Sequence, residues 1–195
     1  PKQNYAENPK QNFHTLSNMI NTMNHRGPDT YGYKIINSCC LAHTRLSIID
    51  LENGRQPMAY KRDENTYYIV YNGEIYNYKE VKKQLLEKNY TFHTNSDTEV
   101  IIAAFCHYGP EFVRELNGIF AIAIYDSMRN TLYLYRDRFG VKPLYYTKTG
   151  DTLVFASRID TLFEYPRVRP CIDMNSLNEI FSLGPAKTYG KGVFS

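Results

Sequence analysis

Strand-like segments of this sequence come in closely spaced pairs, and this pairing restricts the chain to few folds. The runs at 119–125 and 132–135 are joined by a short polar turn, and those at 144–147 and 153–156 are joined around Gly150. Strands joined by so few residues run antiparallel. Predicted helices lie between groups of strands, which is not the strict alternation of a doubly wound parallel fold. We therefore expect an α+β fold of antiparallel sheets with covering helices.

Hydrophobic periodicity predicts the remaining elements. Residues 1–12 are polar and are expected to form a loop, and a helix over 13–23 is expected to stop at Gly27 and Pro28. The other predicted elements are strands at 33–50 and 67–71, helices opened by capping boxes at Asn77/Glu80 and Ser96/Glu99, a short helix with Pro110 at its first position, and a helix at 174–183. Alternation in the strand over 33–50 places Arg45 opposite a mainly apolar face made by Cys40, Ala42, Thr44, Leu46 and Ile48.

The length of the chain suits one domain. A chain of 195 residues can bury one well-packed core and is short for two. We expect that domain to occupy residues 1–185. Residues 186–195 show no periodicity and are expected to begin a connection to a further domain.

Charge, hydropathy and cysteine spacing argue against several classes of function. The net charge is +3 and the Lys and Arg are scattered, which does not favour nucleic-acid binding. No apolar run is long enough to span a membrane. Cys39, Cys40, Cys106 and Cys171 show neither disulfide-framework nor metal-ligand spacing. Reduced thiols in the cytoplasm, and no metal site, are therefore expected.

Asn72-Gly73 is the first candidate for chemistry. The dipeptide is typical of a hairpin turn, but no partner strand follows, because the residues after Glu74 lead into a helix. At a strand end, an Asn amide and an unobstructed glycine N–H offer two neighbouring donors that can hold a developing oxyanion. Sequence alone leaves both interpretations open.

Three charged residues are candidates for substrate binding. Arg45 can be a solvated or ion-paired side chain, but its planar guanidinium also suits a substrate carboxylate. Asp97 suits the first turn of a helix on electrostatic grounds alone, and Glu74 can simply be solvated. A substrate ammonium group, however, needs carboxylates such as these two.

Seven short blocks occur in order along the chain and together resemble one known family. They are His25-Arg26-Gly27-Pro28-Asp29, His43 to Asp50, Gln56-Pro57-Met58, Tyr71 to Asn77, Ser96-Asp97-Thr98-Glu99, Leu116 to Ala121, and Arg136 to Tyr146. Each block alone is weak, but the series resembles the N-terminal domain of glutamine-dependent asparagine synthetases. These domains are class II glutamine amidotransferases and N-terminal-nucleophile hydrolases. The resemblance runs from about residue 13 to the C-terminus.

The resemblance implies a fold, a reaction and a set of site residues. The fold would be a four-layer αββα sandwich, and the reaction the hydrolysis of glutamine to glutamate and ammonia. Arg45 matches the position that grips the glutamine α-carboxylate, and Glu74 and Asp97 match those that hold its α-ammonium. The Asn72 amide and the Gly73 N–H match the oxyanion hole. Residues matching Leu46, Ile48 and Ile49 line the same pocket.

The resemblance also implies parts that the printed sequence lacks. The family nucleophile is an N-terminal cysteine whose own α-amino group is the base, on a first strand that would precede Pro1. The chain as printed is therefore expected to be inactive, since none of its four cysteines carries a free α-amino group. A C-terminal synthetase domain using ATP and Mg would receive the ammonia and amidate aspartate, whereas no cofactor is expected in this domain. The resemblance leaves open whether the protein forms a homodimer.

Two other functions remain as alternatives. Relatives such as β-lactam synthetases keep this domain without the nucleophile, as a non-catalytic structural module, and a free glutamine-binding protein would need the same pocket. The retained Arg45, Asn72, Glu74 and Asp97 favour the enzyme, because a structural domain does not need a glutamine pocket.

Overall fold

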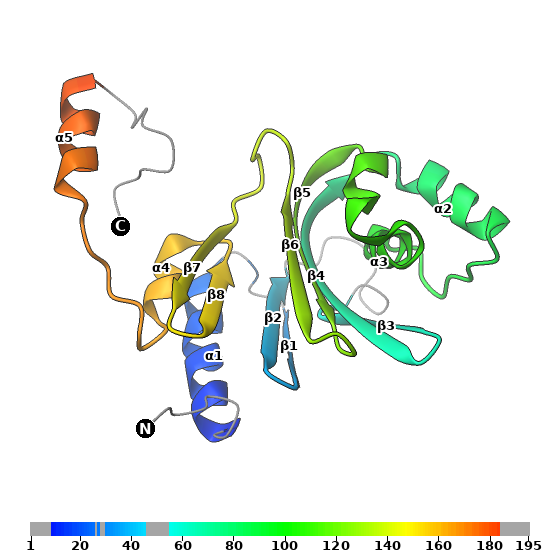
Figure 1. Cartoon of the computed structure of the whole chain (residues 1–195), viewed down its shortest axis with the longest axis horizontal. Coiled ribbons are helices and arrows are strands. Elements are labelled where there is room, and N and C mark those ends of the chain that lie inside the picture. Colours follow the sequence, from blue (N-terminus) through cyan, green and yellow to red (C-terminus); the bar gives the residue numbers. More distant parts are fainter. Residues whose placement is uncertain (1–8, 26, 28–29, 46–54, 184–195) are drawn as a thin grey trace.

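The computed structural model describes residues 9–25, 27, 30–45 and 55–183 (Figure 1). Its helices are α1 (Pro9–Met23), α2 (Tyr78–Glu87), α3 (Asp97–Tyr108), the 3-10 helix η2 (Gly109–Glu115), α4 (Ile159–Phe163) and α5 (Met174–Leu183). Its strands are β1 (Thr30–Ile36), β2 (Cys39–Arg45), β3 (Met58–Arg62), β4 (Asn65–Ile75), β5 (Gly118–Asp126), β6 (Thr131–Arg136), β7 (Tyr145–Thr149) and β8 (Thr152–Ala156). The main sheet has the order β3-β4-β5-β6, and β1-β2 and β7-β8 form separate hairpins.

Helices and sheets are stacked in four layers (Figure 1). The helices α2 and α3 cover one face of the main sheet, the two hairpins lie on its other side, and α1 and α4 lie outside the hairpins. Every strand pair in the described ranges is antiparallel. The α+β fold of antiparallel sheets with covering helices, expected from the paired strands and the family resemblance, is therefore confirmed.

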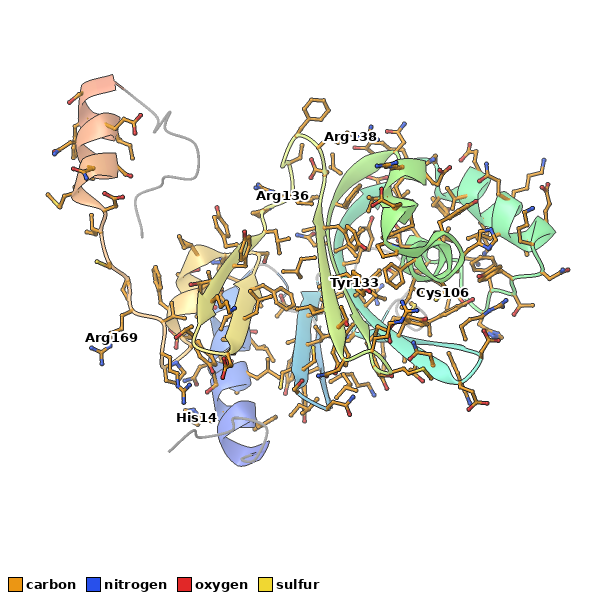
Figure 2. The ribbon with its side chains drawn as sticks, viewed as in Figure 1. His14, Cys106, Tyr133, Arg136, Arg138 and Arg169 are labelled. Atoms are coloured by element: carbon orange, nitrogen blue, oxygen red, sulfur yellow. The ribbon has the colours of Figure 1, made fainter. Side chains whose placement is uncertain are left out.

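The main core lies between α3 and the main sheet. Residues 98–105 of α3 are all buried, because the sheet lies beneath this helix and α2 and η2 pack against it. The core joins Ile102 and Phe105 of α3 to Ile69 of β4 and Ile122 of β5. Cys106 packs against this cluster (Figure 2), and burial raises the pKa of its thiol to about 12.

A second, smaller core holds the β1-β2 hairpin against the main sheet. It joins Leu41 of β2 to Val70 of β4 and to Ala123 and Tyr125 of β5. The expected single apolar face of β2 is wrong, because Leu41 is fully buried on the face opposite to the one predicted. Both faces of β2 are covered, since α1 also packs against this strand.

Two predicted boundaries near the N-terminus are wrong. The first helix begins at Pro9 rather than at residue 13, which suits proline, because the first helical position needs no N–H donor. The strand expected over 33–50 is a hairpin, β1-β2, that turns at Asn37 with φ of 49°. Asparagine tolerates this left-handed conformation, so Asn37 was a turn signal that the strand prediction overlooked. Residues 46–50 lie outside the described ranges.

The two predicted capping boxes differ in outcome. Ser96 is the N-cap of α3, and its Oγ accepts from the N–H of Thr98 at 3.2 Å. Glu99 does not complete that box, because its carboxylate accepts from the N–H groups of His93 and Thr94 instead. Asn77 does not cap α2 through its side chain.

Asn77 instead ties α2 to the segment before β5. Its Nδ2 donates to Glu115 O and its Oδ1 accepts from Asn117 N–H, both at 2.8 Å.

The strand β3 and the helix α4 were not predicted. The short helix with Pro110 near its start and the helix over 174–183 are confirmed.

Candidate functional site

The site lies on an edge of β4. β3 pairs with β4 only up to Met58 opposite Ile69. Beyond that point no strand of the described ranges lies on this side of β4, while β5 continues on the other side. Asn72 and Gly73 are inside this segment, opposite Ala121 and Phe120. The expectation that the strand ends at Asn72 without a partner is therefore wrong, although the hairpin interpretation is excluded as well.

Side chains take the place of a neighbouring strand along this edge. The N–H of Tyr71 donates to Oε1 of Gln56 at 2.6 Å, and the C=O of Tyr71 accepts from Nε2 of Gln56 at 3.1 Å. Four residues further along β4, the N–H of Ile75 points to Oδ2 of Asp97 at 3.5 Å. Tyr71 and Ile75 direct their backbone groups to the same side of the strand, because that direction alternates with a period of two.

Gly73 lies midway between these two contacts and directs its N–H to the same side. Its opposite residue, Phe120, directs its backbone groups to the far side, where its C=O accepts from the Asp137 N–H and its N–H donates to the Asp137 carboxylate, so it does not bond Gly73. Within the described residues, this N–H has no partner and is open to the edge. A Cβ on Gly73 would lie 2.1 Å from the carbonyl oxygen of Ile119, so a larger residue requires the strands to shift.

Two carboxylates lie beside the open N–H. Oδ2 of Asp97 accepts a hydrogen bond from the hydroxyl of Tyr71 at 2.8 Å, and Glu74 is exposed on β4. Burial raises the pKa of Asp97, the hydrogen bonds from Tyr71 and Ile75 oppose this, and the charge of Glu74 adds to it. Two carboxylates that repel each other in this way are well placed to bind a cation.

Arg45 is the last described residue of β2, and its backbone is closely packed. A Cβ on Gly27 would lie 2.6 Å from the backbone N of Arg45, so glycine at 27 lets the preceding segment approach this strand end. His43 precedes Arg45 on the same face of β2. Burial lowers the pKa of His43 to about 4, with a smaller opposing effect from its hydrogen bond to the Tyr71 backbone. The ring is therefore neutral at pH 7.

These groups surround one cavity of about 1830 Å³. Its lining includes five of the predicted site residues, namely Arg45, Asn72, Gly73, Glu74 and Asp97. Asn72 and Glu74 lie two positions apart and share the face of β4 that looks toward the hairpins. The structure thus brings together a guanidinium, two carboxylates and two amide donors. The other three predicted residues, Leu46, Ile48 and Ile49, lie outside the described ranges.

The Arg136–Tyr146 block contains the loop between β6 and β7, which lies at the same cavity. The carboxylate of Asp137 accepts hydrogen bonds from the N–H groups of Phe120, Phe139, Val141 and Lys142. Arg136 donates to the carbonyl oxygens of Gly140 and Lys142, and Figure 2 shows Arg136 and Arg138 on this loop. Val141 and Lys142 line the cavity, so the loop forms part of its wall.

Three residues that bear on the site were not singled out from the sequence. They are Gln56, Tyr71 and His43, and all three line the cavity. All three belong to the recognised blocks, and that membership was the available signal. Their roles depend on contacts across the fold that no local pattern encodes.

In the described part of the chain, no group of three or more His, Cys, Asp or Glu residues is arranged to hold a metal ion. None of the described helices has the length and apolar character that crossing a bilayer requires.

Two solved structures share this fold. Glutamine phosphoribosylpyrophosphate amidotransferase from B. subtilis, complexed with ADP and GMP, matches with a TM-score of 0.55 and 24% identity, over 64% of this chain and 28% of its own. An allosteric regulatory enzyme of purine biosynthesis matches with a TM-score of 0.57 and 23% identity, over 64% and 29%. This chain therefore shares the fold of these two enzymes over about two thirds of its length.

Sequence comparison defines the family. A glutamine amidotransferase domain model matches residues 3–195, so the chain belongs to the glutamine amidotransferase domain family. It is 41% identical over 180 residues to asparagine synthetase [glutamine-hydrolyzing] 3 of Bacillus subtilis (strain 168), covering 92% of this chain and 29% of that protein. It is 42% identical over 134 residues to asparagine synthetase B of Escherichia coli (strain K12), covering 68% and 24%. The chain thus spans less than a third of the length of these relatives.

Proposed function

We propose that this domain hydrolyses the side-chain amide of glutamine, releasing glutamate and ammonia. The observation that carries the proposal is the open N–H of Gly73, which lies in one cavity with Arg45 and a pair of carboxylates. A free amino acid has one α-carboxylate and one α-ammonium, and this cavity offers complementary charge for both. The amide of its side chain would then lie near the oxyanion donors.

Each site residue has a defined task in this reaction. The Arg45 guanidinium binds the α-carboxylate by charge-assisted hydrogen bonds. Glu74 and Asp97 bind the α-ammonium. When the amide carbon becomes tetrahedral, its oxygen becomes negative, and the Asn72 amide and the Gly73 N–H stabilise it. The C–N bond of the tetrahedral intermediate then breaks, the nitrogen takes up the proton released by the attacking thiol and leaves as ammonia, and water hydrolyses the resulting thioester to glutamate.

In the proposed reaction the nucleophile is an N-terminal cysteine of the full-length protein. Its thiol attacks the amide carbon and its α-amino group accepts the thiol proton. Cys39 and Cys40 also line the cavity, but burial raises the pKa of Cys39 to about 12 and also raises that of Cys40. Neither forms a thiolate readily at pH 7, so neither is a good nucleophile.

The full-length protein is proposed to use the ammonia to amidate aspartate. This step belongs to a further domain, which would bind ATP and Mg, and the great length of the asparagine synthetase relatives supports it. Cys39, Cys40, Cys106 and Cys171 are not joined by disulfides, which is consistent with a reducing cytoplasm.

The test is an assay of glutamate release and asparagine formation by the full-length protein. Glutamine with ATP and aspartate should give both products, and the 195-residue chain alone should release no glutamate. A folded full-length protein with an N-terminal cysteine that releases no glutamate would point to a structural domain. Glutamate release by the 195-residue chain, at the mass of that chain, would contradict the proposed nucleophile.

A further inference from the structure

We propose that Gln56 is a positioning residue for the oxyanion hole. Its side chain takes the place of a neighbouring strand beside Tyr71. The Gly73 N–H thereby remains the donor on this edge of β4 that is available to the substrate. The inference rests on the proposed glutamine hydrolysis for its kinetic consequence. The clamp itself is a structural claim that can be tested separately.

The carboxamide of Gln56 reproduces the pairing of a peptide group. One oxygen accepts from the Tyr71 N–H at 2.6 Å, and the nitrogen of the same amide donates to the Tyr71 C=O at 3.1 Å. The ladder between β3 and β4 ends at Met58 opposite Ile69, and Tyr71 is the next residue of β4 on that side. Gln56 therefore extends the ladder by one more pair of hydrogen bonds.

Gln56 is itself held in place by the fold. Gly32 of β1 packs against its backbone so closely that a Cβ on Gly32 would lie 2.1 Å from the Gln56 carbonyl oxygen. The next residue, Pro57, is buried. The clamp therefore connects the β1-β2 hairpin, which carries Arg45, to the strand that carries Asn72 and Gly73.

Occupying Tyr71 has two consequences for the oxyanion hole. The Tyr71 N–H lies two residues from that of Gly73, about 7 Å along the same edge. Unclamped, it would be a second donor facing the cavity and could draw the substrate carbonyl or water away from Gly73. The clamp at Tyr71 and the Asp97 contact at Ile75 also fix β4 on both sides of Gly73, which sets the direction of its N–H.

The chemistry of the clamp requires glutamine at this position. In Gln56→Glu, one carboxylate oxygen can still accept from the Tyr71 N–H, but the second faces the Tyr71 C=O and repels it. In Gln56→Met, the side chain keeps its length but offers no comparable donor or acceptor. Both variants should therefore loosen the Tyr71 peptide by different routes, although the hydrogen bond between His43 and the Tyr71 backbone remains. Gln84→Glu is the matched control, since Gln84 is an exposed residue of α2.

The kinetic test uses the full-length protein and compares kcat and KM for glutamine hydrolysis. Misplacement of a catalytic group by about 1 Å can cost about a hundredfold in rate, so kcat should fall roughly ten- to a hundredfold in both Gln56 variants. KM should change little, because Arg45, Glu74 and Asp97 hold the α-groups of glutamine. Wild-type kcat in Gln56→Met and Gln56→Glu, or a rise in KM alone, would overturn the assignment.

A second measurement separates this inference from the proposed function. Hydrogen exchange of the Tyr71 amide should be slow in the wild type and in Gln84→Glu, and much faster in Gln56→Met. Exchange within residues 98–105 of α3 should be unchanged, which shows that the variant is folded. Unchanged exchange at Tyr71 would overturn the clamp, whereas a wild type that does not hydrolyse glutamine would contradict only the proposed function.

Discussion

At the scale of single residues, backbone direction matters as much as side-chain chemistry in this site. Asn72 and Gly73 are neighbours, yet they serve the cavity differently. The side chain of Asn72 projects from the face of β4, whereas the N–H of Gly73 points outward from the edge of that strand. Two donors of different origin can therefore converge on one oxygen, as an oxyanion hole requires.

Arg45→Ala in the full-length protein should impair glutamine use selectively. A charge-assisted contact to a carboxylate contributes roughly 1.5–3 kcal/mol, so kcat/KM for glutamine should fall at least about tenfold. Asparagine synthesis from free ammonia should persist, because it bypasses this cavity. Arg114→Ala, at an exposed residue paired with Glu111, is the control and should change neither activity. An unchanged kcat/KM for glutamine would remove Arg45 from the site.

Asn72→Ala should change the rate more than the binding. Loss of one oxyanion donor typically costs about 10² to 10³ in kcat, because that donor acts mainly on the transition state. KM for glutamine should change much less. Steady-state kinetics of glutamate release measure both quantities, and full kcat in this variant would contradict the oxyanion assignment.

His43 should make stability depend on pH. Its pKa is about 4 in the folded protein and about 6.5 in the unfolded chain. Above pH 6.5 the ring is neutral in both states, so it has no effect. As pH falls from about 6.5 to about 4, His43 becomes protonated in the unfolded state but stays largely neutral in the folded state. Stability is then lost, by at most about 3 kcal/mol.

The measurement is urea unfolding of wild type and of His43→Gln at pH 7.5 and pH 4.5. The wild type should lose more stability between the two values than His43→Gln does. His14→Gln, at an exposed position of α1, should behave as the wild type. Equal losses in the wild type and in His43→Gln would show that His43 does not resist protonation.

At the scale of elements, short segments are held by single polar side chains. The loop after β6 has few backbone bonds of its own and closes around Asp137. Burial alone would raise the pKa of Asp137, but hydrogen bonds from the N–H groups of Lys142, Val141, Phe120 and Phe139 bring it below its usual value. This loop forms part of the cavity wall, so its order bears directly on the site.

Asp137→Asn should loosen that loop. The amide nitrogen would face backbone N–H donors, so at least one buried donor would lose its acceptor at a cost of about 1–3 kcal/mol. Urea unfolding should show this loss, and hydrogen exchange should rise at residues 139–142. Asp151→Asn is the control, because Asp151 is exposed in the β7-β8 turn. Wild-type stability and exchange in Asp137→Asn would refute the bracing role.

At the scale of the whole molecule, the four layers bring parts of one site from distant segments. β2 supplies Arg45 from the hairpin layer, β4 supplies the donors from the main sheet, and Asp97 comes from the start of α3. The tie between α1 and α4, through the hydroxyls of Thr22 and Thr161 at 2.7 Å, closes the outer layer around the hairpins. The cavity therefore depends on the assembled fold rather than on any single layer.

An additional residue before the N-terminal cysteine of the full-length protein should abolish glutamine hydrolysis. The thiol would remain, but its base would be converted from an amine into a peptide nitrogen. Asparagine synthesis from free ammonia should continue at the rate of the unextended protein, which serves as the control for folding. Glutamate release at the normal rate from the extended protein, with its mass confirmed, would contradict the use of the α-amino group.

Some predictions succeeded because they rested on neighbours in the chain. The hairpins β5-β6 and β7-β8 follow from short polar turns, and Ser96 caps α3 because an N-cap contacts only the next turn of its helix. Others failed for the same reason. Asn77 had the local pattern of a capping box, but partners near Asn117, about forty residues away, engaged its side chain instead.

The sequence by itself determined the class of fold, and five of the eight candidate site residues that it predicts line one cavity. Paired strand runs and ordered motifs contain that information without coordinates. Only the tertiary structure decided which backbone groups of β4 are occupied and which is open. The contacts from Gln56 to Tyr71, from Asp97 to Ile75 and from Phe120 to Asp137 join residues 15 or more positions apart. A hydrogen-bond donor is free or occupied according to what the fold places opposite it, and that placement has no local signature.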